Sequence, residues 1–181
     1  MSLRHGVSMP PATAAECRKD LPIMLQPLLP WWRALPREGL MPLWTGELVF
    51  DLKPWLAYLL MARFPRDGRP PRYTLYGTEL VAFAGRDLTG LDLYDSGDVP
   101  GFRETGDSYI TARTTGRPHW SRVRVDLPGA LKVRYDRLLL PFACLDGDAR
   151  VLGAIRFDQH LPRLWESDDM ALTIEQEALL A

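Results

Sequence analysis

The side chains that most often do chemistry in proteins are few in this chain and widely spaced. The three histidines are His5, His119 and His160, and none is followed two to four residues later by a second ligand, so the spacing predicts no metal site. A general base would have to be Asp87, Asp92 or His119, and none of these lies among the apolar residues of an expected strand. No nucleophile-elbow, phosphate-loop or dinucleotide-binding pattern occurs. We therefore expect no catalytic residues and a protein that is not an enzyme.

Composition indicates the location and the class of partner. A formal net charge of −1 argues against a nucleic-acid partner, which usually requires a strongly basic face. The two cysteines, Cys17 and Cys144, lie far apart and form no metal or redox spacing, as expected of reduced thiols. The first residues lack the apolar run of a signal peptide, and the longest apolar run, 55–61, is too short to cross a bilayer. We expect a cytoplasmic protein without membrane insertion.

A ligand site is suggested by the stretch from Arg72 to Asp92. Its first five residues, R-Y-T-L-Y, are rich in aromatic residues and typical of a strand. Gly77 ends that pattern, and Thr78 can cap a short helix that stops at Gly85. A strand that passes through glycine into short helical turns predicts a cup over a sheet, and such a cup can hold a small ligand.

The same stretch resembles the PAS sensor-domain superfamily, and within it a bacterial subfamily of stand-alone PAS-like proteins. The resemblance lies in the succession of a strand, G-T-E-L, a short helix and G-R-D-L-T-G. Further segments match that subfamily in the same order over roughly residues 28–157: W-W-R-A-L at 31–35, F-D-L-K-P-W-L at 50–56, Y-D-R-L-L-L-P-F at 135–142 and V-L-G-A at 151–154. The resemblance implies an α+β fold with a five-stranded antiparallel sheet. It also implies that helices inserted after the second strand pack over one face.

The sequence pattern predicts matching elements. A flexible tail at 1–19 precedes a helical extension and arm at 20–50, a PAS-like domain at 51–158 and a C-terminal helix at 159–181. Strands are expected at 56–64, 72–76, 120–127, 131–145 and 151–157, with a bulge near 137–141 where the alternation blurs. Helices are expected to flank the domain at both ends. One begins at Pro30, and the other is capped by Ser167 and presents Met170, Ile174 and Ala178 on one face.

The cup defines the candidate ligand pocket. If the inner face of the sheet meets the helices as expected, the pocket lining comprises Tyr76, Phe83, Leu93, Tyr109, Trp120, Phe142 and Cys144. A core filled by side chains is the alternative. Some PAS relatives hold flavin beside a reactive cysteine, which the turns 85–88 and 90–93 lack, and some hold haem through a histidine, for which His119 is the candidate. We predict no cofactor, and leave open an unidentified small ligand.

Three functions remain open. The first is a stand-alone sensory or regulatory module that signals in trans, to a signalling protein or within a homodimer, through contacts at Trp31, Trp32 and Ile174. The second is a small-molecule enzyme that uses a general base in the pocket. The third is an interaction scaffold with a filled core.

Overall fold

The structure is a computed structural model of the 181-residue chain. It describes residues 21–95, 99–158 and 170–180. The predicted tail at 1–19 and the predicted helix cap Ser167 lie outside the described residues.

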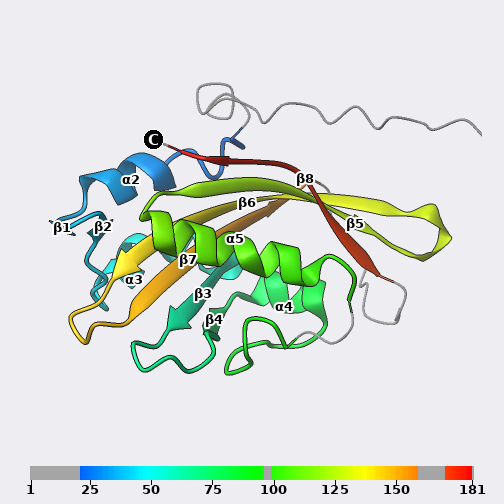
Figure 1. Ribbon diagram of the computed structural model, residues 1–181. Helices are drawn as coiled ribbons and strands as arrows, with labels where there is room; N and C mark the ends of the chain where they lie inside the picture. The colour runs from blue at the N-terminus through cyan, green and yellow to red at the C-terminus, as the bar shows by residue number, and fades with distance from the viewer. Residues whose placement is uncertain (1–20, 96–98, 159–169, 181) are drawn as a thin grey trace, which may run out of the picture.

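An antiparallel sheet runs through the centre of the molecule (Figure 1). Its six strands have the order β4-β3-β7-β6-β5-β8, and every neighbouring pair is antiparallel. The strands are β3 (Leu59–Phe64), β4 (Arg72–Tyr76), β5 (His119–Asp126), β6 (Lys132–Ala143), β7 (Ala149–Phe157) and β8 (Ala171–Leu179). The predicted α+β class is therefore confirmed, with one strand more than predicted.

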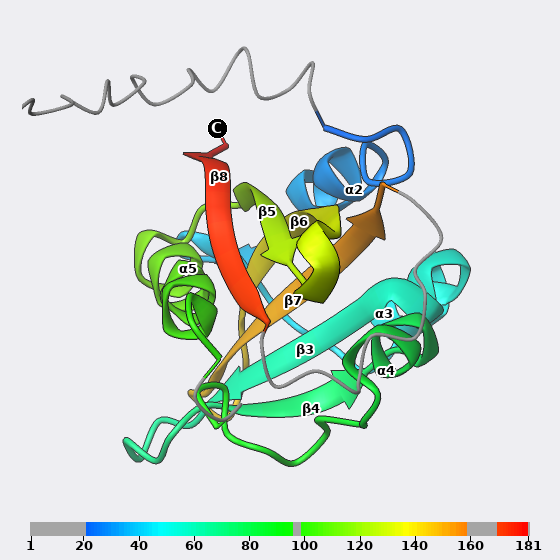
Figure 2. The same cartoon turned by 90° about the vertical axis from the view of Figure 1, so that its right-hand side faces the viewer.

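Helical segments cover both faces of this sheet. They are α2 (Leu28–Ala34), α3 (Leu48–Asp51), the 3-10 helix η1 (Lys53–Tyr58), α4 (Thr78–Ala84), α5 (Phe102–Thr115) and the 3-10 turn η2 (Pro128–Ala130). A short separate ribbon joins β1 (Arg37–Glu38) to β2 (Met41–Pro42). Figure 2 shows α5 on one side of the sheet and α2 on the other. As expected, α4 and α5 follow the second strand of the sheet along the chain.

The two faces of the sheet bury separate apolar cores. The α5-side core contains Leu60, Ala62, Phe64, Leu80, Tyr109, Val123, Val133 and Leu139 among others. The α2-side core contains Leu25, Leu28, Trp32, Leu59, Met61, Trp120, Leu138 and Phe142 among others. Strand β3 contributes alternate residues to the two cores, because successive side chains of a strand point to opposite faces.

The predicted bulge near 137–141 is wrong. Strand β6 pairs residue by residue with β7 from Tyr135 to Ala143 and with β5 from Lys132 to Leu139, without a register shift. Its apolar run is continuous because both of its faces are buried from Tyr135 to Phe142. A strand covered on both sides loses its alternation without any slip, and the sequence run was therefore misread as a bulge.

The predicted C-terminal helix is also wrong where the structure describes it, because 171–179 form the edge strand β8. A register shift between Arg122 and Val123 interrupts its pairing with β5. Leu172 and Ile174 consequently pack on the α5-side core, whereas Ala178 packs on the α2-side core. Pairing with the free edge of β5 overrides the helix propensity of Glu, Gln, Ala and Leu in this segment.

One group of ion pairs ties β8 to its neighbour β5 and to β6, the next strand of the sheet. Glu175 accepts hydrogen bonds from Arg124 at 3.1 Å and from Arg134 at 2.8 Å. These contacts lower the pKa of Glu175, the hydrogen bond from Arg134 having the largest effect.

Among the described residues, none of the helices combines the length and the apolar character that a membrane span requires.

Candidate functional site

A partly open cavity of about 130 Å³ lies between α4, α5 and the sheet. Apolar side chains from four elements form most of its wall: Leu60, Leu80, Phe83, Ile155, Phe157 and Leu172. The rings of Phe83 and Phe157 pack in a tilted arrangement with centroids 4.6 Å apart, which holds α4 over the end of β7. The sequence forms this wall because β3, β7 and β8 each direct apolar residues toward α5.

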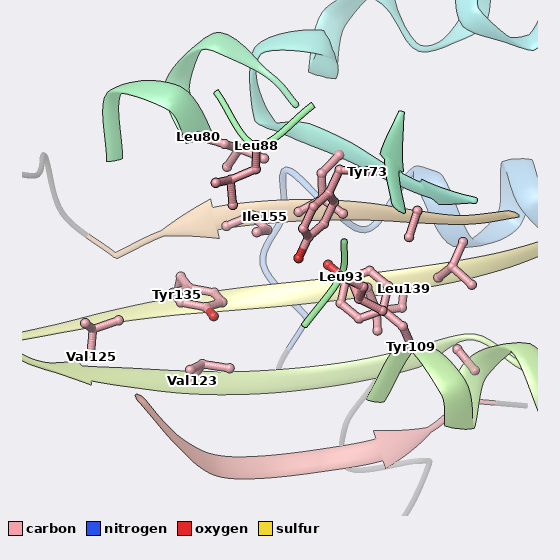
Figure 3. Close-up of a cluster of buried hydrophobic side chains, with 14 of the residues drawn as sticks. Tyr73, Leu80, Leu88, Leu93, Tyr109, Val123, Val125, Tyr135, Leu139 and Ile155 are labelled. Atoms are coloured by element: carbon pink, nitrogen blue, oxygen red, sulfur yellow. The ribbon is translucent and has the colours of Figure 1, made fainter. Parts of the chain in front are cut away.

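Four tyrosines, Tyr73, Tyr76, Tyr109 and Tyr135, complete much of the wall; we call them the four cavity tyrosines. Figure 3 shows Tyr73, Tyr109 and Tyr135 entering one cluster from β4, α5 and β6. Burial raises the pKa of each of the four, that of Tyr109 to about 12. They are therefore neutral phenols near pH 7, able to donate hydrogen bonds.

Arg137 brings a buried positive charge to the same wall. Its side chain reaches the α5 side because it alternates with Tyr135 and Leu139 along β6, and the residue is only 3% exposed. Its Nε donates to Ser121 Oγ at 3.2 Å, and its Nη1 donates to the carbonyl oxygen of Thr105 at 2.9 Å. Its Nη2 is buried and makes no hydrogen bond.

No carboxylate of the described residues forms an ion pair with Arg137. Its guanidinium instead lies 5.1 Å from the ring centroid of Tyr109, a cation–π arrangement. The positive charge also opposes the rise in the pKa of Tyr109 that burial causes. The cavity thus joins apolar walls, phenol hydroxyls and one buried guanidinium.

The structure places the predicted pocket residues in different regions. Tyr76, Phe83 and Tyr109 line the cavity, and Leu93 is buried in the α5-side core without lining it. Trp120 and Phe142 belong to the α2-side core, on the opposite face of the sheet. Cys144 lies just beyond β6 and is half-buried.

Sequence reasoning missed Tyr73, Tyr135 and Arg137 as cavity residues. A signal for two of them is present in β6, where Val133, Tyr135 and Arg137 occupy alternate positions and therefore share one face. The assumed bulge obscured that alternation.

The predicted general-base candidates do not line the cavity. Asp87 caps a turn, and the hydrogen bonds it accepts from Thr89 lower its pKa. Asp92 pairs with Arg72 at 2.7 Å. His119 is 3% exposed, with its Nε2 3.2 Å from a carboxylate oxygen of Glu177. No group of three or more potential metal ligands occurs among the described residues.

The predicted interface residues make contacts within the chain. Trp32 is 3% exposed, and its Nε1 donates to the carbonyl oxygen of Pro141 at 2.9 Å. Trp31 is half-buried beside Phe142, with ring centroids 6.2 Å apart. Ile174 packs on the α5-side core. Trp32 therefore forms part of the interior and not of a contact surface.

A second hollow, of about 370 Å³, lies on the α2 side between Trp44, Leu56, Leu75 and Arg150. Arg150 carries a buried Nε without a hydrogen bond. The pKa of Asp148 is lowered mainly by hydrogen bonds from the Arg66 backbone and the Arg63 side chain, and the charge of Arg150 makes the smallest contribution. The first cavity, which combines four tyrosines with a buried arginine, is the better candidate for a ligand site.

Comparison of the chain with protein-family models, with curated proteins and with solved structures gives no match.

Proposed function

We propose that this chain is a cytoplasmic PAS-like sensory or regulatory module that binds a small, largely apolar ligand. The cavity beneath α4 and α5 is the observation that carries the proposal. An apolar pocket with a few convergent polar groups is the usual form of a small-molecule site. The insertion of α4 and α5 after the second strand of the sheet agrees with the arrangement that the PAS resemblance implies.

Binding is favoured over the two alternatives on specific grounds. An enzyme would need a base that faces its substrate, and Asp87, Asp92 and His119 lie outside the cavity wall. A scaffold would need a filled core, whereas about 130 Å³ beside the four cavity tyrosines is open. For comparison, an apolar cavity of about 150 Å³ binds benzene.

Native mass spectrometry of the purified full chain tests the ligand site. We expect a bound mass in the range of a small organic molecule, released when the protein is denatured. Ala84 lines the cavity, so Ala84→Phe should fill it and remove that mass. Glu79→Phe adds the same ring at an exposed position of the same helix and should leave the mass in place.

A wild-type protein without a bound mass, whose thermal unfolding no small aromatic or aliphatic compound shifts, would contradict the proposal. So would a bound mass that survives Ala84→Phe. Output would pass in trans, to a partner protein or a second copy of the chain. Strictly monomeric behaviour in light scattering, with and without ligand, together with failure to recover any partner, would refute that part.

A further inference from the structure

We propose that the ligand of this cavity carries one anionic group of the carboxylate class, and that Arg137 binds it. This inference rests on the proposed ligand site and adds the chemistry that the site selects. The observation behind it is a buried guanidinium with which no carboxylate of residues 21–95, 99–158 or 170–180 forms an ion pair.

The first step concerns the unmatched charge. A buried arginine is rare unless it is paired, because removing a charge from water costs several kcal/mol. Arg137 is 3% exposed, and its two hydrogen bonds go to neutral oxygens of Ser121 and Thr105. Neither neutralises the charge, and Nη2 makes no hydrogen bond. A bound anion would supply both the missing charge and the missing acceptor.

The second step concerns Glu177, a carboxylate in the same cross-strand row as Arg137. Arg137 pairs across β6 and β5 with Ser121, and Ser121 pairs across β5 and β8 with Glu177, so the three form one row. Ser121 stands between the two charges. The carboxylate of Glu177 contacts His119, which has the largest effect in lowering its pKa, and its side chain is 53% exposed. The charge of Arg137 also lowers the pKa of Glu177, so the two groups attract each other. They form no ion pair, however, and the Nη2 of Arg137 stays without an acceptor.

The third step concerns the class of anion. A guanidinium offers parallel N–H donors that match the two oxygens of a carboxylate. Tyr109 lies beside Arg137 and remains a neutral phenol, so its hydroxyl can donate to the same anion. The remaining wall is apolar, and a volume of about 130 Å³ admits roughly one ring or a short chain. The geometry points to a small aromatic or aliphatic monocarboxylate.

Two probes of nearly equal size test this, benzoate and the uncharged benzyl alcohol. Dissociation constants are measured by titration calorimetry on the full-length protein, with amide NMR shifts to place each probe in the cavity. The wild type should bind benzoate at least tenfold more tightly than benzyl alcohol. Arg137→Gln should abolish this preference by weakening benzoate binding at least tenfold more than it weakens benzyl alcohol binding. Arg137→Lys keeps the charge without the paired donors and should retain a smaller preference.

The outcomes separate the two proposals. If the wild type binds benzyl alcohol in the cavity as tightly as benzoate, the ligand site stands and the anion inference is overturned. If the preference for benzoate persists in a folded Arg137→Gln variant, Arg137 is not the group responsible. If neither probe binds, the proposed ligand site and this inference are both contradicted. The wild-type comparison is decisive even if Arg137→Gln fails to fold.

Discussion

Gly101 sits where the N-terminus of α5 meets the edge strand β8, and its replacement by alanine should selectively loosen that strand. Gly101 has φ of +78°, and a Cβ placed on it would lie 1.8 Å from the carbonyl oxygen of Leu172. The obstructing atom belongs to the backbone and cannot rotate away. Either β8 or the start of α5 must therefore move when this Cβ is added.

The expected cost has two parts. The left-handed conformation costs an alanine about 1–2 kcal/mol. Moving β8 away also breaks the hydrogen bond from the Leu172 N–H to the Pro100 carbonyl, 2.8 Å long, which contributes about 1 kcal/mol. Partial loss of the Leu172 side chain from the α5-side core adds about 1–2 kcal/mol. The free energy of unfolding should thus fall by about 3–5 kcal/mol.

Gly90 provides a matched control. Its φ is +88°, and no atom lies within 4 Å of the position that its Cβ would occupy. Gly90→Ala should therefore show the conformational cost alone, about 1–2 kcal/mol. The clash at Gly101 is the difference between the two variants, about 2–3 kcal/mol.

Urea denaturation and calorimetry measure that difference, which corresponds to about 4–12 °C in Tm for a chain of this size. Hydrogen exchange should also quicken at 171–179 in Gly101→Ala and stay unchanged there in Gly90→Ala. Equal destabilisation of the two variants, with β8 equally protected in both, would refute the close approach and with it the placement of β8.

Two further predictions concern the cavity and the α2-side core. Burial raises the pKa values of the four cavity tyrosines. The stability that the neutral phenols confer should therefore be complete below about pH 10 and decline as the pH rises toward their folded-state pKa values. At pH 11, tyrosinate absorbance near 295 nm should be clearly lower in folded than in denatured protein, and equal absorbance would contradict the burial of these tyrosines. Trp32→Phe removes the donor to the Pro141 carbonyl in a buried site and should lower the free energy of unfolding in urea by about 1–3 kcal/mol. Trp31→Phe should lower it less, because the Nε1 of Trp31 donates to Asp51 at an exposed site. A larger loss at Trp31 than at Trp32 would show that the buried contact is misplaced.

Local pattern was sufficient for much of the framework. The strand at 72–76 has the predicted bounds, and the helix that follows it ends before Gly85 as predicted. The strand predicted at 56–64 is present as β3, Leu59–Phe64. These features depend on side-chain period and turn residues, which a short segment carries within itself.

The site was only partly predictable for a related reason. The structure confirms three predicted pocket residues, Tyr76, Phe83 and Tyr109. They lie in or shortly after the predicted cup, where the succession of strand, glycine turn and helix in the sequence indicates which side chains face the sheet. Trp120 and Phe142 are as apolar as any pocket residue, but strand pairing turns them toward α2. Burial of a large aromatic residue does not by itself reveal which core receives it.

The sequence by itself determined the α+β class, the succession of the first five sheet strands and the absence of the motifs that signal common catalytic sites. Only the tertiary structure decided that 171–179 pair with β5 as a strand, that both faces of β6 are buried and that Arg137 is enclosed with its Nη2 lacking a hydrogen bond. The physical reason is the range of the interactions involved. Helix and strand periods are set by neighbours in the chain, whereas edge pairing, the choice of core and charge neutralisation depend on residues that meet only after folding.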